Sequence, residues 1–123
     1  MLVDARGNPL EFALTSGAAG DNPQAIPLLA GKQTRAVPAD RGYDADATIA
    51  SIAQDRGAVA TIPPKKNRVA PRECDYAAYK ERHLVECCIG QRQHFRRVCT
   101  RFDKYAHRFL AFVHFASMCL WLK

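Results

Sequence analysis

The sequence predicts one small α/β domain that ends in two long helices. Segments with strand character enclose a helical segment between residues 35 and 62, and from residue 76 onward apolar residues recur at helical spacing. The chain has 123 residues, 48% of them hydrophobic, which fits a single folded domain over residues 1–123. No internal repeat and no linker divides it.

An antiparallel hairpin is expected at the start of the chain. Residues 1–4 have the apolar character of a strand end, residues 6–9 are rich in turn formers, and residues 10–15 alternate apolar and polar side chains. A short helix should follow, with Asp21 as its cap and Gly31 at its end.

A strand, a helix and a second strand are expected next. Residues 35–39 form the first strand, which ends at Asp40, and residues 58–62 form the second. The helix between them is capped by Asp44 or Asp46. This order predicts a right-handed crossover that joins two parallel strands.

Two helices are expected in the last third of the chain, over about residues 76–93 and 103–122. The second helix carries an apolar stripe that should form core, made of Phe102, Phe109, Leu110, Val113, Ala116 and Leu120.

The charge is unevenly distributed along the chain. Residues 1–64 carry five basic and seven acidic groups, whereas residues 65–123 carry thirteen basic and five acidic groups, so the whole net charge of +6 arises in the second half. Such a concentrated positive charge favours a polyanionic partner, most often nucleic acid, and the alternative is a solvated helical surface. The expected DNA-facing groups are an exposed basic loop with Lys65, Lys66, Arg68 and Arg72, and an arginine group with Arg92, Arg96, Arg97 and Arg101.

Membrane and zinc-binding classes are not favoured. The longest apolar run, residues 109–122, is shorter than the roughly 20 residues that span a bilayer, and the N-terminus has no signal-peptide pattern, so we expect a cytoplasmic location. The five cysteines are an odd number without a CxxC pair, which predicts reduced thiols rather than disulfides or a zinc site.

Two carboxylates stand out by position. Asp40 lies at the carboxyl end of a predicted parallel strand, where open α/β sheets gather reacting groups. Glu86 lies in the predicted helix 76–93, and Tyr79, Arg82 and Gln93 share its face at 100° per residue. The apolar side of that helix lies roughly opposite.

The spacing Tyr79-x-x-Arg82-x-x-x-Glu86, preceded by Ala-Asp-Arg-Gly-Tyr-Asp at residues 39–44, resembles bacterial insertion-sequence DDE transposases of the four/five type. Their signature is Y-x2-R-x3-E-x6-K. Further similar stretches follow in the same order and cover nearly the whole chain.

The resemblance implies an RNase H-like fold, here partial because it lacks the first central strand. It makes Asp40 the second and Glu86 the third carboxylate of a triad that holds two Mg²⁺ ions for DNA cleavage and strand transfer. Tyr79 and Arg82 would contact the DNA backbone near the cleaved strand. Gln93 stands at the position of the signature lysine and keeps a donor without the charge.

The first catalytic aspartate of the family has no counterpart in this sequence. Asp4 matches a different aspartate, on the hairpin, and is an imperfect substitute. We therefore expect a transposase fragment that is inactive alone, either a decayed remnant or the product of a split reading frame, which pairs with an N-terminal transposase segment or a full-length transposase. The alternative function is a non-catalytic DNA-binding remnant.

Overall fold

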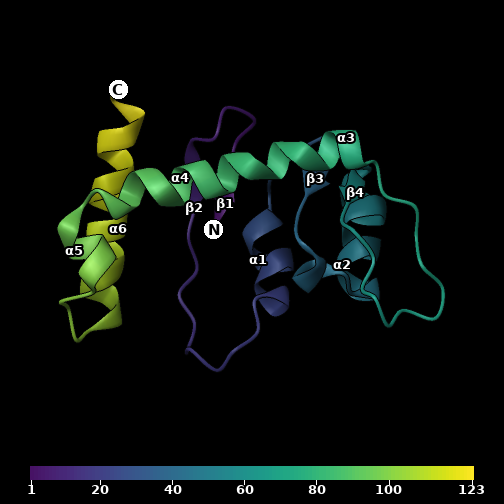
Figure 1. Ribbon diagram of the computed structural model, residues 1–123, viewed down its shortest axis with the longest axis horizontal. Helices are drawn as coiled ribbons and strands as arrows, with labels where there is room; N and C mark the ends of the chain where they lie inside the picture. Colours follow the sequence, from purple (N-terminus) through teal and green to yellow (C-terminus); the bar gives the residue numbers. More distant parts are fainter. The chain divides into compact units, whose positions relative to one another are not determined.

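Figure 1 shows the computed structural model, which describes all residues from 1 to 123. The fold is mixed α/β, mostly helical with short strands. The chain forms two compact units: unit 1 consists of Met1–Ser16 and His83–Lys123, and unit 2 of Gly17–Arg82. No helix is both long enough and apolar enough to cross a membrane.

Unit 1 begins with the predicted hairpin. Strand β1 (Leu2–Val3) pairs antiparallel with β2 (Pro9–Glu11), so the second strand is shorter than the predicted segment 10–15. Gly7 has a φ of 83° in the turn between them, a left-handed conformation that glycine adopts without steric cost.

Three helices complete unit 1: α4 (His83–Gln93), α5 (Arg96–Thr100) and α6 (Ala106–Trp121). Helix α6 confirms the predicted C-terminal helix, but it starts later than residue 103. Helix α5 was not predicted, and it ends at Arg101, whose φ of 49° is left-handed. Figure 1 shows α5 beside α6, and the two helices are in contact.

The core of unit 1 lies between the hairpin and the helices. Val113 and Ala116 of α6 are buried, as the apolar stripe predicted. The prediction was wrong for Phe102, which precedes α6 and is 60% exposed. The indole Nε1 of Trp121 donates to the Pro9 carbonyl oxygen at 2.8 Å, which fastens the end of α6 to β2.

Unit 2 opens with a 3₁₀ turn (Asn22–Gln24) and helix α1 (Ala25–Leu29). The prediction that Asp21 caps this helix was wrong: its backbone is already helical, with φ −79° and ψ −28°, and its side chain accepts no capping hydrogen bond. A cap requires an extended residue that turns its side chain back onto the first turn. Gly31 follows with a φ of 70°.

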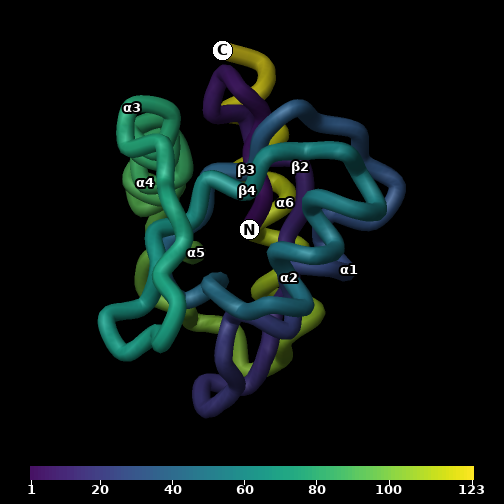
Figure 2. The backbone as a smooth tube through the Cα atoms, turned by 90° about the vertical axis from the view of Figure 1, so that its right-hand side faces the viewer, coloured from purple at the N-terminus to yellow at the C-terminus, as the bar shows by residue number.

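The strand–helix–strand prediction is confirmed in unit 2. Strand β3 (Ala36–Pro38) pairs in parallel with β4 (Val59–Thr61), and Figure 2 shows the two running side by side. Helix α2 (Asp46–Ala50) continues as a π-helix (Ser51–Asp55) between them. The hairpin and this parallel pair form separate sheets.

The predicted cap of α2 was wrong. Ala45 stands at the N-cap position, and neither Asp44 nor Asp46 caps the helix. Asp44 is instead one of the most buried residues of unit 2, with 3% exposure, and the apolar core of the same unit includes Leu29, Ile52 and Ile62.

The predicted helix 76–93 is present, divided by a 3₁₀ turn. Helix α3 (Tyr76–Tyr79) belongs to unit 2 and runs into the 3₁₀ turn Lys80–Arg82, after which α4 begins in unit 1. Asp75 caps α3, because its carboxylate accepts from the backbone N–H groups of Ala77 and Ala78 at 2.9 and 3.2 Å.

Candidate functional site

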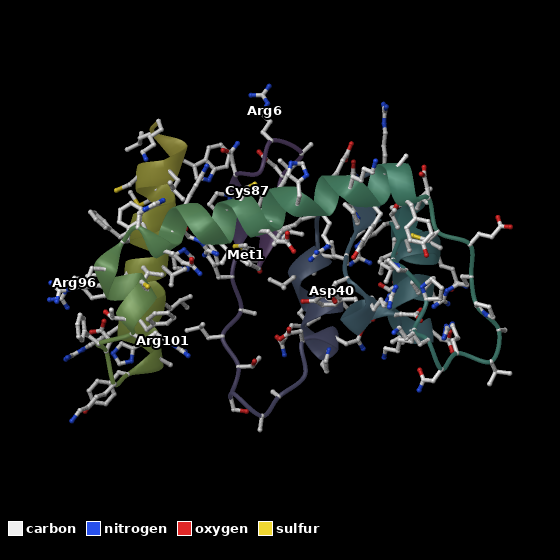
Figure 3. All side chains as sticks on the ribbon, in the orientation of Figure 1. Met1, Arg6, Asp40, Cys87, Arg96 and Arg101 are labelled. Carbon is white, nitrogen blue, oxygen red and sulfur yellow. The ribbon has the colours of Figure 1, made fainter.

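Asp40 is an exposed carboxylate just beyond the carboxyl end of β3. Backbone pairing continues to Ala39, whose N–H donates to the Thr61 carbonyl oxygen at 3.3 Å. Asp40 then caps the 3₁₀ turn Arg41–Tyr43, and its Oδ1 accepts from the Gly42 N–H at 2.7 Å. The cap fixes the direction of this side chain, labelled in Figure 3.

The Asp40 carboxylate affects the pKa of Tyr43 and lies close to Gly42. The pKa of Tyr43 is raised above its ordinary value by burial and by the negative charges of Asp21 and Asp40. A Cβ at Gly42 would lie 2.9 Å from the Asp40 Oδ1, closer than real Cβ atoms approach such an oxygen, so glycine permits the close approach.

Gly42→Ala should therefore displace the Asp40 side chain and weaken the cap. Because the clashing oxygen is the end of a flexible, exposed side chain, we expect a decrease of only about 0.5 kcal/mol in the free energy of unfolding, measured from the urea midpoint. Gly20→Ala is the matched control, because nothing lies within 4 Å of a Cβ there. Equal midpoints for the two variants would contradict the role of Gly42.

Asp44, four residues further on, organises the segment of residues 65–72, which we call the basic loop. The Asp44 side chain is fully buried. Its carboxylate accepts from the Lys65 N–H at 2.7 Å and forms ion pairs with Arg68 and Arg72. Asp46, 86% exposed at its side chain, pairs with the same two arginines.

The prediction of four exposed cations in the basic loop was therefore wrong for two of them. Arg68 and Arg72 have side chains only 18% and 32% exposed, and their charges are compensated by Asp44 and Asp46. Lys65 and Lys66 are exposed, as predicted. Sequence alone missed this because the partners lie more than 20 residues apart.

Glu86 and Gln93 are exposed on α4 in unit 1, and Cys88 on the other side of the helix is buried. Tyr79 and Arg82 lie in unit 2, where the Arg82 guanidinium carbon stands 5.6 Å from the centre of the Tyr79 ring. The single row of four side chains that was predicted on one helix is therefore divided: Tyr79 and Arg82 belong to one unit, and Glu86 and Gln93 to the other. Asp40 belongs to unit 2 and Glu86 to unit 1.

The two arginines of α5 and Arg101, which follows it, stack on aromatic rings. The guanidinium carbons of Arg96, Arg97 and Arg101 lie 5.8, 4.8 and 4.7 Å from ring centres, over Phe102, Phe112 and Phe109 respectively. All three arginines are exposed, and Figure 3 shows Arg96 pointing away from the helices. Stacking orients a guanidinium while its N–H groups remain available for phosphate oxygens.

Arg92 does not belong to this exposed group, contrary to the prediction. It is 8% exposed, its guanidinium carbon lies 4.8 Å from the centre of the Phe12 ring, and it donates to the Cys88 carbonyl oxygen at 3.4 Å. Burial lowers its pKa. Its position four residues after Cys88, on the apolar side of α4, is the sequence signal that identifies it as a core residue.

Asp4 serves the hairpin turn. Its Oδ1 accepts from the backbone N–H groups of Arg6 and Asn8, both at 2.8 Å, and its Oδ2 accepts from the Asn8 side chain at 3.0 Å. Burial opposes ionisation, but these hydrogen bonds and the Arg6 charge prevail and lower the pKa of Asp4.

No group of three or more His, Cys, Asp or Glu side chains is placed to hold a metal ion. All five cysteines are free, and burial raises the pKa of Cys74 and Cys88, which keeps them as thiols at neutral pH.

Comparison with known proteins places the chain in a family. Residues 1–119 match the family described as "Transposase DDE domain". The chain is 41% identical over 123 residues to a protein of Brucella ovis named "Putative transposase for insertion sequence element IS6501", with 99% of this chain and 95% of that protein covered. No solved structure matches. The chain belongs to the family of DDE transposase domains of insertion sequences.

Proposed function

We propose that this chain is part of the catalytic domain of an insertion-sequence transposase that cleaves and joins DNA, with Asp40 and Glu86 as two of its three catalytic carboxylates. The observation that carries the proposal is Asp40: an exposed, directionally fixed carboxylate just beyond parallel strand β3, within a chain of the DDE family. Glu86 contributes from the exposed face of α4.

We propose that the domain has an RNase H-like fold with one strand absent, which is consistent with its two separate sheets. The hairpin β1–β2 and the parallel pair β3–β4 each have only two strands, and two-stranded sheets are marginally stable on their own. In the RNase H-like fold that the resemblance implies, one further strand pairs with both sheets and carries the third aspartate. We infer that the active domain contains such a strand, which residues 1–123 do not supply.

The residues in this chain do not by themselves fit the two-metal site that the family resemblance implies. Such a site needs three acidic groups around the ions, and no three metal-binding side chains gather here. No catalytic step is therefore assigned to this chain alone. The carboxylates of Asp40 and Glu86 are oxygen donors of the kind that Mg²⁺ prefers.

DNA binding is assigned to five exposed cations. Lys65 and Lys66 present ammonium groups on the basic loop, and Arg96, Arg97 and Arg101 present stacked guanidinium groups on unit 1. Tyr79, Arg82 and Gln93 are proposed to contact the backbone beside the cleaved strand. Arg68 and Arg72 hold the basic loop in shape and contribute indirectly.

Replacement of the two lysines should reduce the salt dependence of DNA binding. In Lys65→Gln/Lys66→Gln, the slope of log affinity against log salt should fall by about 0.9 for each phosphate that the protein no longer neutralises. The control, Arg6→Gln/Lys123→Gln, removes the same charge from exposed positions elsewhere, of which Arg6 is seen at the hairpin in Figure 3. An equal slope in both variants would assign the lysines to a solvated surface.

A non-catalytic DNA-binding remnant is the second candidate function. The absence of a gathered acidic triad favours it. It predicts DNA binding through the same cations, but no cleavage in the presence of any added segment.

A further inference from the structure

Unit 2 contains a cleft that the proposed active site does not use. It has a volume of about 660 Å³ and lies between residues 31–35, which follow α1, and Asp55 and Arg56 at the end of the π-helix. It is large enough for a group the size of a nucleotide.

The walls of this cleft are positively charged. Lys32, Arg35 and Arg56 line it together with a single carboxylate, Asp55, while Gln33 and Thr34 add neutral polar groups. The cations that line the cleft therefore outnumber its one carboxylate.

Arg56 is held as a fixed cation. Its side chain is only 12% exposed, its Nε donates to the Leu29 carbonyl oxygen at 3.2 Å, and its Nη1 donates to the carbonyl and hydroxyl oxygens of Ser51 at 3.1 and 2.7 Å. These partners are neutral. Asp55 lies 3.9 Å away with its side chain 67% exposed, which makes it a weak, water-screened partner.

We propose that this cleft binds a phosphate oxyanion, supplied by the phosphodiester backbone of nucleic acid. The proposal rests on the proposed function for the source of the phosphate. The fixed Arg56 guanidinium, with Arg35 and Lys32 beside it, offers charge-assisted N–H donors that match tetrahedral oxyanions. The Thr34 hydroxyl donates to the Ala36 carbonyl oxygen at 2.9 Å, which fixes the opposite wall next to β3.

Inorganic phosphate tests the cleft directly. Titrated into the full chain, it should shift the amide resonances of residues 31–35 and Arg56 in a saturable manner. Lys32→Gln/Arg35→Gln should weaken this binding by at least about tenfold, whereas Arg6→Gln/Lys123→Gln should not change it. Arg56 is left in place because it joins α1 to the π-helix. No saturable shift in the wild type, or equal binding by both variants, would overturn the proposal.

Duplex DNA tests the source of the phosphate. In Lys32→Gln/Arg35→Gln the salt slope of DNA binding should fall by about 0.9 for each phosphate no longer neutralised, with the control unchanged. Saturable phosphate binding with an unaltered DNA slope would overturn the backbone as the source and assign the cleft to a free phosphate. Wild-type protein that binds phosphate in the cleft but does not bind DNA would refute the proposed function as well as that source.

Discussion

Asp44→Asn should lower the free energy of unfolding by about 2–3 kcal/mol, more than any other carboxylate substitution in unit 2. The substitution keeps the shape of the side chain but removes the negative charge that Arg68 and Arg72 share, and removing a charged hydrogen-bond partner from a buried site costs this much. The partial exposure of both arginines sets the expected value below that of a fully buried pair. Urea denaturation measures the difference.

Asp46→Asn is the matched control for Asp44→Asn. It removes a carboxylate from the same two arginines, but its side chain is 86% exposed, so the expected decrease in stability is below about 1 kcal/mol. Asp44→Asn should also speed tryptic cleavage after Lys65, Lys66 and Arg68, because the loop is no longer anchored. Equal stability of the two variants would contradict the role of Asp44.

The effect of Asp44 should depend on pH. Burial opposes ionisation of this carboxyl, but the Lys65 N–H, Arg72 and Arg68 prevail and lower its pKa below the usual value near 3.8. A depressed folded-state pKa contributes stability above the unfolded-state pKa, and that contribution disappears as the pH falls through the folded-state pKa. The difference in stability between wild type and Asp44→Asn should therefore start to shrink as the pH falls below the unfolded-state pKa, and it should disappear only below the lowered folded-state pKa of Asp44.

Local patterns predicted most of the secondary structure. The alternation of strand and helix character over residues 35–62 predicted parallel strands β3 and β4, and turn residues predicted the hairpin. The helical spacing around Glu86 predicted which side of α4 is exposed, since Cys88 on the opposite side is buried. These features depend on neighbouring residues, which is why sequence periodicity detects them.

The features that were missed depend on tertiary interactions. Asp44 lies where the sequence predicts a helix cap. It is a buried ion-pair partner instead because residues 65–72 fold back against it, which local sequence does not indicate. Arginine is a residue type that usually lies at the surface, but the guanidinium of Arg92 packs over the Phe12 ring. Helix α5 is only five residues long, too short for periodicity to detect.

The second large effect is the expected loss of DNA cleavage when the acidic set is incomplete. We expect the chain alone to leave DNA intact in the presence of Mg²⁺, because under the proposed function Asp40 and Glu86 supply only two of the three carboxylates of the site. A polypeptide encoded by the same element, carrying a β-strand with an aspartate, should pair with the edges of β1–β2 and β3–β4 and complete the acidic set. An Asp→Ala variant of that added strand should still improve solubility but should not restore cleavage.

Within such a mixture, Asp40→Ala and Glu86→Gln should each lower the rate of cleavage by at least about a thousandfold, since removing a catalytic carboxylate takes away several kcal/mol of transition-state stabilisation. Glu73→Gln is the control, because Glu73 is exposed in a loop outside the proposed site. Its rate should equal that of the wild type. DNA affinity should be similar in all three variants, which separates catalysis from binding.

The decisive measurement is magnesium-dependent cleavage of a labelled DNA duplex. Comparing the chain alone with the chain plus the added strand tests whether Asp40 and Glu86 belong to a divided transposase site. The account predicts cleavage only in the mixture, abolished in Asp40→Ala and in Glu86→Gln and kept in Glu73→Gln. Cleavage by the chain alone, cleavage in the mixture that survives Asp40→Ala, or a soluble mixture that never cleaves would contradict it.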